Sequence, residues 1–347
     1  MEPGLATELP ACAEGSLSLE AFSDARASVE LHDDWQLLQG RATEDNIFLT
    51  WEWQHAWWAE LGQNLSLDLC AFYDRGRLVA VTPAYRKEEQ SRTLLRFGGG
   101  LEVTDYLGFL VEAEYREATG CAFLRHCLEL PGLVLDFHFL REDGVTLQAI
   151  QVAAKSLGLR QHLQPEEVSP RILLDCDWET YLQTLDKKAR HELRRKRRRM
   201  EEAGGWQIRE SEPATLAEDL ESFFALHSRS SHAKADFLDE DKKNFFRHIC
   251  GDLMQAGWLS LRFLRFRDRD AAAVMGFVYR DKLLAYNSGY EPELRALSPG
   301  LVLMSEEVRL AAEARLKEVD FLRGSEKYKY DLGAHDVPLL HLMLEAP

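Results

Sequence analysis

The sequence contains an internal repeat, and this repeat constrains the fold more than any other feature. In the first half, "GLEVTDYLGFLV" (100–111) is followed by a helical stretch and then by "GLVLDFHFL" (132–140). In the second half, "YNSGYEPEL" (286–294) is followed by a helical stretch and then by "EVDFLRG" (318–324). A strand-like run, a helix and a buried strand therefore occur twice in the same order.

The spacing inside the two repeats also matches. Tyr106 precedes Asp136 by 30 residues, and Tyr290 precedes Asp320 by 30 residues. Each repeat follows an apolar helix pattern and two strand-like runs that a polar turn joins. The helix patterns are "WEWQHAWWAEL" (51–61) and "AEDLESFFALH" (217–227), and the strand pairs are "LDLCAFYD" with "RLVAVTPAY" and "WLSLRFLRF" with "AAVMGFVYR". A duplicated domain explains both the order and the spacing.

Runs of strands with helices packed between them are typical of an α+β or mixed α/β layer. The repeat therefore predicts tandem duplicated domains, each with a mixed, mainly antiparallel sheet flanked by helices. A length of 347 residues fits two domains of roughly 150 residues each. We expect a flexible N-terminal tail at 1–29, a first domain at 30–175 and a second at 176–347.

A dense basic segment lies where the second domain is expected to begin. Between Lys187 and Arg199 there are nine Lys or Arg and one acid, a local charge of +8, whereas the whole chain carries −16. Apolar residues at helical spacing interrupt the charges; they are Leu182, Leu185, Ala189, Leu193 and Met200. These patterns predict one amphipathic helix, capped by Asp175 or Asp177 and ended by Gly204-Gly205.

The apolar stripe of this helix would dock on the domain and leave its arginines outward. The outward set is expected to be Arg194, Arg195, Arg197, Arg198 and Arg199. A solvated face is the simplest interpretation of such a charge run, but five arginines in six residues exceed what solubility requires. We expect this face to meet an anionic ligand, with phosphate-bearing molecules as the leading class.

Composition excludes several other classes of protein. A net charge of −16 argues against a general nucleic-acid coat, because most of the surface would repel a polyanion. Six cysteines without a Cys-x-x-Cys pair suit neither a disulfide framework nor a zinc ribbon, so no metal is expected. No apolar run approaches the ~18 residues of a membrane span, and the first residues lack a signal-peptide pattern. A cytoplasmic protein with buried thiols and no transmembrane segment is predicted.

Two stretches of the second half carry candidate chemistry. "ALSPGLVLMSEEVRLAAEA" (296–314) places Pro299 and Gly300 in a first helical turn, whose free N–H groups suit phosphate or pyrophosphate. The first half has no Pro-Gly at the matching place, so the first copy is expected to be inactive. "VDFLRGSEKYKYDLG" (319–333) gathers polar groups after an apolar strand, a common arrangement at binding sites. A polar loop with an internal Glu–Lys pair is the alternative interpretation.

These strings, with "ALHSRSS" (225–231), resemble the CelD-like branch of the GNAT N-acyltransferases. That branch is similar in build to the Fem-type transferases, which carry two GNAT-like domains in tandem. The resemblance covers roughly residues 30–340 and is strongest at 285–333. It implies transfer of an acyl group from a thioester, usually acetyl-CoA, to an amine. In such a reaction the amine attacks directly in a ternary complex.

The resemblance also implies roles for particular residues. The pyrophosphate of acyl-CoA is expected at the helix start formed by Ser298, Pro299, Gly300 and Leu301. The candidate catalytic residues are Glu326, Asp320 and His227 as base and Tyr328 as proton donor. The candidate substrate-binding residues are Tyr290, which is also a donor candidate, Arg229, Arg323, Lys329, Arg194 and Arg195. Asp320 is alternatively structural, and His227 alternatively a satisfied histidine at a helix end.

The chain departs from standard GNAT enzymes at the pyrophosphate loop. Their loop is Arg/Gln-x-x-Gly-x-Gly/Ala, whereas "LSPGLV" keeps one glycine. The predicted function is acyl-CoA-dependent N-acylation of an amino sugar or a cell-envelope or polysaccharide precursor, the acceptor being a small molecule or a lipid- or nucleotide-linked sugar. One alternative is a Fem-type transferase that uses aminoacyl-tRNA, and the other is a non-catalytic scaffold that binds an anionic partner.

Overall fold

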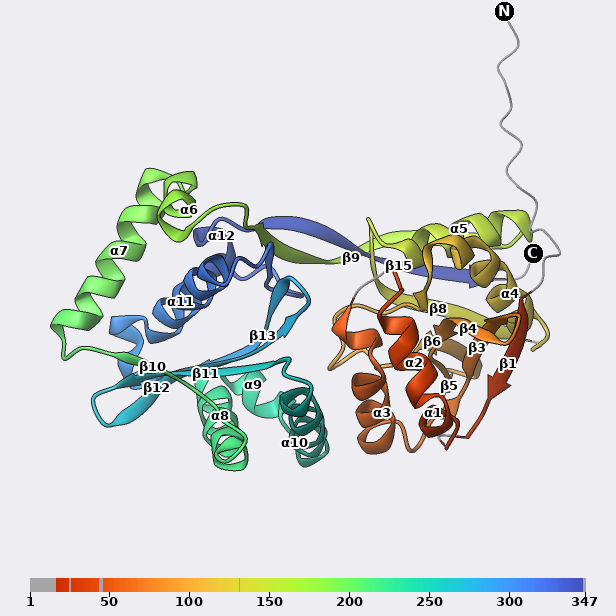
Figure 1. The fold of residues 1–347 in the computed structure, drawn as a ribbon, viewed down its shortest axis with the longest axis horizontal. Helices are drawn as coiled ribbons and strands as arrows, with labels where there is room; N and C mark the ends of the chain where they lie inside the picture. Colours follow the sequence, from red (N-terminus) through yellow and green to blue (C-terminus); the bar gives the residue numbers. More distant parts are fainter. Residues whose placement is uncertain (1–16, 25, 44–45, 131, 346–347) are drawn as a thin grey trace, which may run out of the picture. The chain divides into compact units, whose positions relative to one another are not determined.

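The computed structural model describes residues 17–24, 26–43, 46–130 and 132–345, and these form two compact units (Figure 1). The first unit comprises residues 1–166 and 338–347, and the second comprises 167–337. Residues 167–175 therefore belong to the second unit, although the sequence pattern had favoured the first domain. The last ten residues return to the first unit instead of completing the second.

The helices and strands of the first unit follow the order that the repeat predicts. Its α-helices are α1 (Arg26–Glu30), α2 (His32–Gln39), α3 (Trp51–Glu60), α4 (Arg116–Leu128) and α5 (Val145–Ser156), with 3-10 turns η1 (Ile47–Leu49) and η2 (Ala113–Tyr115). Its strands are β1 (Ser18–Phe22), β2 (Ser66–Leu67), β3 (Leu69–Asp74), β4 (Arg77–Thr82), β5 (Ala84–Glu89), β6 (Arg92–Phe97), β7 (Leu110–Val111) and β8 (Leu133–Arg141). The unit boundary falls within β9 (Arg160–Leu173) and within β15 (His335–Glu345).

The strands of the first unit divide between two sheets. One sheet has the order β1-β3-β4-β7, and its described pairs are antiparallel. The other includes β2, β5, β6, β8 and β15, with β6 and β8 parallel. Trp35, Leu49 and Leu69 are buried in a core cluster that includes the α2 face and strand β3. The fold class is as predicted, but the first copy uses two sheets instead of one.

The structure corrects the prediction of a flexible N-terminal tail at 1–29. Residues 1–16 lie outside the described residues. Ser18–Phe22, however, form β1 and pair antiparallel with β3, from Ser18 opposite Tyr73 to Phe22 opposite Leu69. The pattern of this short strand is only half apolar, so its sequence alone does not distinguish it from a loop.

The second unit has one sheet in the order β10-β11-β12-β13-β14-β9. Its strands are β10 (Gln207–Glu210), β11 (Leu259–Phe266), β12 (Arg269–Tyr279), β13 (Lys282–Tyr290) and β14 (Glu318–Asp320). Its helices are α6 (Trp178–Thr184), α7 (Lys187–Glu202), α8 (Leu216–Ser230), α9 (His232–Phe237), α10 (Glu240–Gln255), α11 (Pro299–Glu313) and α12 (Lys327–Asp331), with the 3-10 turn η3 (Pro292–Leu297). Strands β13 and β14 are parallel, and the other described pairs are antiparallel.

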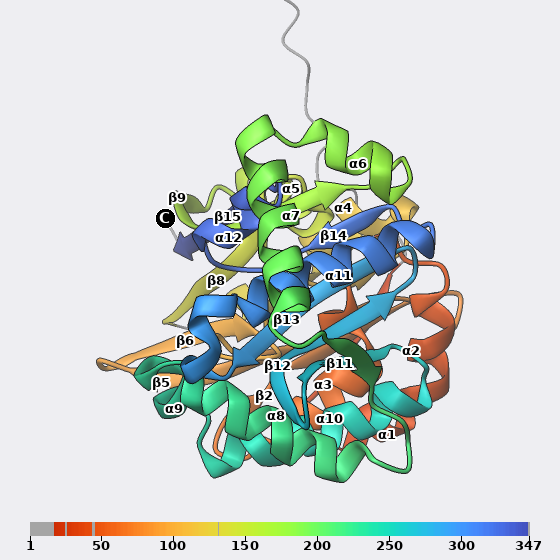
Figure 2. The same ribbon diagram turned by 90° about the vertical axis from the view of Figure 1, so that its left-hand side faces the viewer.

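Helices cover both faces of this second sheet (Figure 1). Helices α8, α9 and α10 lie on one face, and α11 lies on the other together with α7 (Figure 2). The apolar sides of α7 and α11 share a core with β12 and β13 that includes Leu193, Met200, Val302 and Val308. This arrangement is the mixed, mainly antiparallel sheet flanked by helices that the sequence predicts.

The basic segment forms two helices and not one. Leu185 has an extended backbone, so α6 ends before it, and Asp186 caps α7 by accepting a hydrogen bond from the Ala189 N–H at 2.8 Å. Asp177 caps the separate helix α6. Helix α7 ends at Glu202 just before Gly204-Gly205, as predicted. The predicted start was wrong because Asp186 offers a capping carboxylate inside the run of helical spacing.

Candidate functional site

Strand β14 pairs with only the first residues of β13, which leaves an open edge in the second unit. Their parallel register joins Lys282 to Glu318 and ends with Leu284 opposite Asp320. Strand β13 continues to Tyr290, and a register shift near Met275 and Gly276 marks a bulge opposite β12. Bulges re-aim backbone and side-chain groups beside many active sites. Past Leu284, the edge of β13 is therefore available to a ligand or to side chains.

Helix α8 packs unusually close to the far end of β13, and a glycine allows it. A Cβ on Gly289 would lie 2.4 Å from the backbone N of His227, so no other residue fits without a shift of α8. The Tyr290 N–H donates to Ser230 Oγ at 2.8 Å, and the Ser230 hydroxyl donates to the Leu226 carbonyl at 2.7 Å. The motifs "YNSGY" and "ALHSRSS" are thus two sides of one helix–strand contact.

The start of α11 has the open N–H groups that the sequence predicted. Ser298 is the N-cap in a left-handed conformation (φ 56°), without a side-chain cap, and Pro299 is the first helical residue. The first hydrogen bond of the helix runs from the Val302 N–H to the Ser298 carbonyl at 3.1 Å. A Cβ on Gly300 would meet only the Tyr290 ring, at an ordinary 3.7 Å. The N–H groups of Gly300 and Leu301 therefore lie in a first helical turn without a capping side chain, and Tyr290 packs beside Gly300.

A cavity of about 560 Å³ lies between α7, α11 and α12. Leu301 contributes the α11 side of the cavity, and Lys188 and Lys196 contribute the α7 side with Lys327 from α12. Lys327 pairs with Asp331, and Lys196 lies 3.9 Å from Glu192. Within the described chain, Lys188 has no ion-pair partner. Asp186, Glu192 and Asp331 also line the cavity, so the charges of its lining balance. The positive end of the α11 dipole and the unpaired Lys188 ammonium are the features that favour an anionic ligand.

A buried histidine, His227, and a half-buried lysine, Lys234, lie at the same end of β13. Burial, helped by the charge of Lys234, lowers the pKa of His227 to about 4, so its imidazole is neutral at pH 7. Its Nδ1 has no hydrogen-bond partner among the described residues. Lys234 donates from Nζ to the Ser288 carbonyl of β13 at 2.5 Å. Burial lowers the pKa of Lys234, and the Glu326 carboxylate opposes that shift.

Glu326 and Lys329 differ sharply in exposure. The Glu326 side chain is 57% exposed and contacts Lys329 Nζ at 2.9 Å. The Lys329 side chain is 2% exposed, and its ammonium donates to the carbonyls of Leu322, Arg323 and Gly324 at 2.8–3.2 Å. These bonds correct the prediction that Lys329 binds a substrate anion, because its donors are already committed to the backbone. Glu326 stays accessible.

Two further residues of this segment have separate environments. Burial raises the pKa of Tyr328 well above its usual range, with the Glu326 charge as a second cause, so its hydroxyl stays protonated at neutral pH. Asp320 is 3% exposed, and its Oδ1 accepts bonds from Ser169 Oγ at 2.9 Å and from the Leu322 N–H at 2.8 Å. These contacts support the structural alternative for Asp320 over the base. Arg323, three residues after Asp320, is half-buried.

The predicted arginines divide between surface and core. Arg229 is half exposed and lies 3.4 Å from Glu291. Arg194 is exposed, and Arg195 is bound to Glu192 on its own helix at 2.7 Å. The expectation that Arg197 points outward was wrong: it pairs with the buried Glu306 of α11 and lies over the Trp206 ring. Arg197 therefore anchors α7, whereas Arg194, Arg198 and Arg199 supply exposed charge.

Sequence reasoning missed three residues that the fold brings to this region: Lys188, Lys196 and Lys234. The two α7 lysines were counted as part of the basic segment, but their separation by eight positions along one helix face was not used. Lys234 gave no signal beyond the polar stretch "SSHAKAD" (230–236), because its partner Ser288 lies in a strand far along the chain. None of the helices within the described ranges has the length and apolarity to cross a membrane.

Comparisons with known proteins show which family model and which solved structures this chain resembles. Residues 187–330 match the family model described as an acetyltransferase (GNAT) domain. No curated protein matches the chain in sequence. The solved structure of FemX is similar over 90% of this chain and 95% of its own, with a TM-score of 0.65 and 12% identity.

Two other solved structures cover nearly the whole chain. The C-terminal domain of a protein described as a lysylphosphatidylglycerol synthetase from Agrobacterium fabrum has a TM-score of 0.58 at 9% identity, covering 93% of this chain and 92% of its own. A tandem GNAT protein from the clavulanic acid biosynthesis pathway has a TM-score of 0.52 at 14% identity, covering 96% and 99%. At these identities the likeness concerns the fold, which is that of two GNAT-like domains in tandem.

Proposed function

Because residues 187–330 are a GNAT domain within a Fem-like tandem fold, we propose that the second unit is an N-acyltransferase that takes its acyl group from acyl-CoA. The donor pyrophosphate binds the N–H groups of Gly300 and Leu301, with the phosphates toward the cavity that Lys188, Lys196 and Lys327 line. The acyl thioester lies along the open edge of β13. The acceptor is an amine of an amino sugar or of a cell-envelope or polysaccharide precursor.

The observation that carries the proposal is the meeting of two features at one place. The start of α11 has no side-chain cap, and Tyr290, at the end of the part of β13 that extends beyond β14, packs against its Gly300. Acyl-CoA carries a pyrophosphate and, farther along the molecule, a thioester. Its pyrophosphate suits the start of α11, and its thioester suits the open edge of β13. Neither feature alone distinguishes a donor site from a structural helix start.

The proposed chemistry uses groups with suitable protonation at neutral pH. The base, with Glu326 as first candidate and His227 as second, takes a proton from the ammonium form of the acceptor. The amine nitrogen then attacks the thioester carbonyl carbon, and the carbon–sulfur bond breaks. Tyr328 keeps its proton because burial raises its pKa, and it donates that proton to the leaving thiolate of CoA. The Tyr328 phenolate then takes the second proton from the attacking nitrogen, which leaves a neutral amide, the CoA thiol and a protonated Tyr328. No acyl-enzyme is needed.

Two substitutions at Gly300 test the donor site, because a Cβ there makes only ordinary van der Waals contacts. Alanine meets only the Tyr290 ring at ordinary contact distance, and aspartate adds a charge that suits a helix N-terminus but repels a phosphate. We expect acyl-CoA to raise the melting temperature of wild type and Gly300→Ala. Gly300→Asp should fold equally well and bind CoA at least about tenfold more weakly.

Isothermal titration with acetyl-CoA and longer acyl-CoAs measures the binding constants for the three proteins. Absence of any thermal shift in wild type at millimolar acyl-CoA contradicts the acyl-CoA donor. Equal affinity of Gly300→Ala and Gly300→Asp contradicts the position of the pyrophosphate even if CoA binds.

An aminoacyl-tRNA donor is the second candidate, and a separate observation favours it. Helix α7 presents Arg194, Arg198 and Arg199 to solvent beside the proposed donor cavity, and the whole fold is similar to that of FemX. This alternative predicts tRNA retention that falls steeply as salt rises. Arg198→Glu with Arg199→Glu should abolish that retention and leave the thermal shift by acyl-CoA unchanged.

A further inference from the structure

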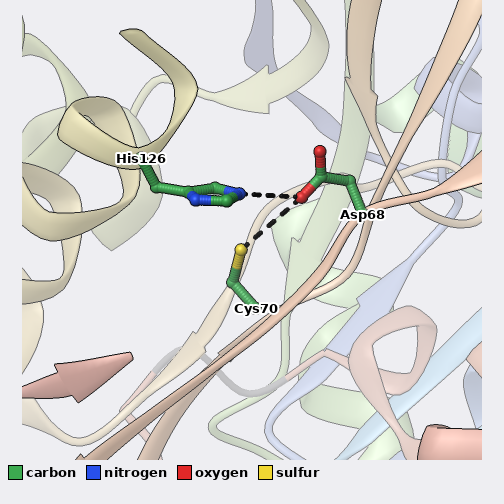
Figure 3. A group of neighbouring side chains, drawn as sticks. All are labelled: Asp68, Cys70 and His126. Atoms are coloured by element: carbon green, nitrogen blue, oxygen red, sulfur yellow. Dashed lines mark hydrogen bonds and ion pairs between the residues drawn. The ribbon is translucent and has the colours of Figure 1, made fainter. Parts of the chain in front are cut away.

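A cluster of three metal-ligating side chains lies in the first unit, apart from the proposed acyltransferase site. Asp68 immediately precedes β3, Cys70 lies within β3, and His126 lies in the last turn of α4 (Figure 3). Their candidate ligand atoms all lie within 4.8 Å of one another. Cys70 is fully buried, Asp68 nearly so, and the His126 side chain is 19% exposed, which leaves a path from solvent.

Two distances within this cluster are close to those around a tetrahedral ion, and the third, from His126 Nε2 to Cys70 Sγ, is at most 4.8 Å. His126 Nε2 lies 3.1 Å and Cys70 Sγ lies 3.7 Å from the same oxygen, Asp68 Oδ1 (Figure 3). Zinc bonds of about 2.0 Å to oxygen and nitrogen and about 2.3 Å to sulfur place tetrahedral ligands about 3.3 Å (oxygen to nitrogen) and about 3.5 Å (oxygen to sulfur) apart. Shifts of a few tenths of an ångström bring both distances from Asp68 Oδ1 to these values, and Zn²⁺ would draw His126 Nε2 and Cys70 Sγ to about 3.5 Å from each other.

The charges of the cluster favour a divalent ion in a buried place. A carboxylate from Asp68 and a thiolate from Cys70 balance the two charges of Zn²⁺, and His126 binds as a neutral imidazole. The Arg86 guanidinium, 3.3 Å from Asp68 Oδ2, adds one positive charge at the partly exposed edge of the cluster. Without an ion, burial and the Asp68 charge hold the pKa of the Cys70 thiol well above its usual range. Binding therefore releases the thiol proton, and any proton on His126 Nε2, to solvent.

A fully buried hydroxyl beside the cluster lacks a partner. Thr82 lies directly opposite Cys70 in the β3–β4 register, so their side chains share one face of the sheet. Thr82 is 0% exposed, and its Oγ1 makes no hydrogen bond within the described residues. Buried polar groups without a partner are rare. A water on the fourth position of the ion would give this hydroxyl one.

A second cluster of an aspartate and two histidines in the same unit does not have the geometry to bind an ion. Asp136 contacts His138 Nε2 through one oxygen and His341 Nε2 through the other, at 3.1 and 2.7 Å. The two imidazole rings stack in parallel at 4.0 Å, so their in-plane lone pairs do not converge on one point. Each cluster has an arginine on its carboxylate: Arg96 Nε donates to Asp136 Oδ2 at 2.7 Å, and Arg86 Nε lies 3.3 Å from Asp68 Oδ2. The ring stacking is therefore the difference between the two clusters. This second cluster is a hydrogen-bonded ion network and provides an internal control.

We propose that Asp68, Cys70 and His126 bind one Zn²⁺ ion, which links β3 to α4 in the first unit. The sulfur ligand and the mixed sulfur, nitrogen and oxygen set favour zinc over magnesium or calcium. Sequence spacing did not reveal the site, because the ligands lie at positions 68, 70 and 126 without a paired Cys motif.

Metal content and cobalt spectroscopy of the full chain test this site. The protein is stripped with a chelator, incubated with Zn²⁺ or Co²⁺ and freed of unbound ion. We expect one Zn²⁺ per chain, a rise of several degrees in melting temperature with Zn²⁺, and a cobalt–thiolate charge-transfer band with Co²⁺. Cys70→Ser should lose the band, and His126→Gln, at the partly exposed ligand, should weaken zinc binding at least about tenfold.

Two control variants separate the site from general metal binding. Cys176→Ser removes another thiol that is more accessible than Cys70, and His341→Gln disrupts the second cluster; both should retain one Zn²⁺ and the full cobalt band. Wild type that retains no Zn²⁺ and shows no thermal shift overturns the proposal. A cobalt–thiolate band that persists in Cys70→Ser or disappears in Cys176→Ser also overturns it.

Discussion

At the scale of single residues, neighbours in the motif "RGSEKYK" have different tasks. Gly324 adopts φ 106°, and a Cβ there would lie 2.6 Å from Glu326 Oε2, so glycine is required for the Glu326 carboxylate to lie over the turn. The buried Lys329 ammonium stabilises the same turn by donating hydrogen bonds to three of its backbone carbonyls. The sequence placed these residues in one loop, but only their burial separates the structural lysine from the accessible carboxylate.

Substitution should therefore separate catalysis from stability at this loop. We expect Glu326→Gln to lower kcat/KM about 100-fold with little change in stability, because exposed ion pairs contribute little. Lys329→Met should cost about 2–3 kcal/mol of unfolding free energy, since it leaves buried carbonyls without a donor. Acyl-transfer kinetics and urea unfolding of both variants measure the two effects. Similar stability losses in both variants would contradict this division.

A pH dependence of stability follows from His138 in the first unit. Burial opposes its charge, but Asp136 and Glu166, at 3.1 and 2.5 Å, outweigh burial and raise its pKa to about 9. His341 stacks on the other side, and Arg96 contacts the same Asp136. Because the folded pKa is raised, this stabilisation is complete below the unfolded pKa of about 6.5 and is lost as pH rises through about 9.

Chemical unfolding of wild type and His138→Gln at pH 6, 8 and 10 checks this expectation. The difference in unfolding free energy should be largest at pH 6, at most about 3 kcal/mol, and should shrink by pH 10. The subtraction removes the other groups that titrate in this range. A difference that stays constant from pH 6 to 10 would show that His138 contributes through packing alone.

At the scale of elements, the contact between α8 and β13 fixes the proposed active site. A Cβ on Gly289 would lie 2.4 Å from the backbone of α8. A Cβ on Gly251, within α10, would meet nothing within 4 Å. We expect Gly289→Ala to cost about 1–3 kcal/mol and to impair transfer. Gly251→Ala should stabilise by about 0.5–1 kcal/mol, because alanine favours a helix.

Denaturant unfolding and acyl-transfer assays distinguish the two glycine variants. Equal stability of both variants, or full activity of Gly289→Ala, would refute the role assigned to the close contact. The sequence indicated a glycine in a strand, which often marks close approach of another backbone, but it did not indicate that α8 approaches.

At the scale of the whole molecule, the chain returns to its first unit at the C-terminus. Residues 338–347 belong to that unit, and β15 pairs with β8 from Leu339 opposite Arg141 to Leu344 opposite Leu135. We expect deletion of 338–347 to destabilise the first unit, because β8 then has an unpaired edge and Asp136 loses His341. The second unit keeps its sheet β10–β14.

Hydrogen exchange read by mass spectrometry measures this effect unit by unit. Peptides that contain β8 should lose protection on truncation, and peptides from β11 and β12 should keep it. A matched truncation that keeps residues 1–345 removes only the last two residues and should leave both units unchanged. Loss of protection confined to the second unit would contradict the assignment of the C-terminal residues.

The sequence by itself determined the mixed α/β class, the duplication, the helix start at Pro299 and the family resemblance, because periodicity, Pro-Gly placement and motif strings are local. Tertiary structure decided what local patterns cannot encode. Asp186 rather than Asp177 caps α7, Arg197 turns inward to Glu306, and Lys234 reaches Ser288. Likewise, Asp68, Cys70 and His126 meet only because α4 packs beside β3. The burial and the charge environment of a polar side chain depend on residues distant in the chain. Those residues determine whether the side chain stabilises the fold or stays accessible to a ligand.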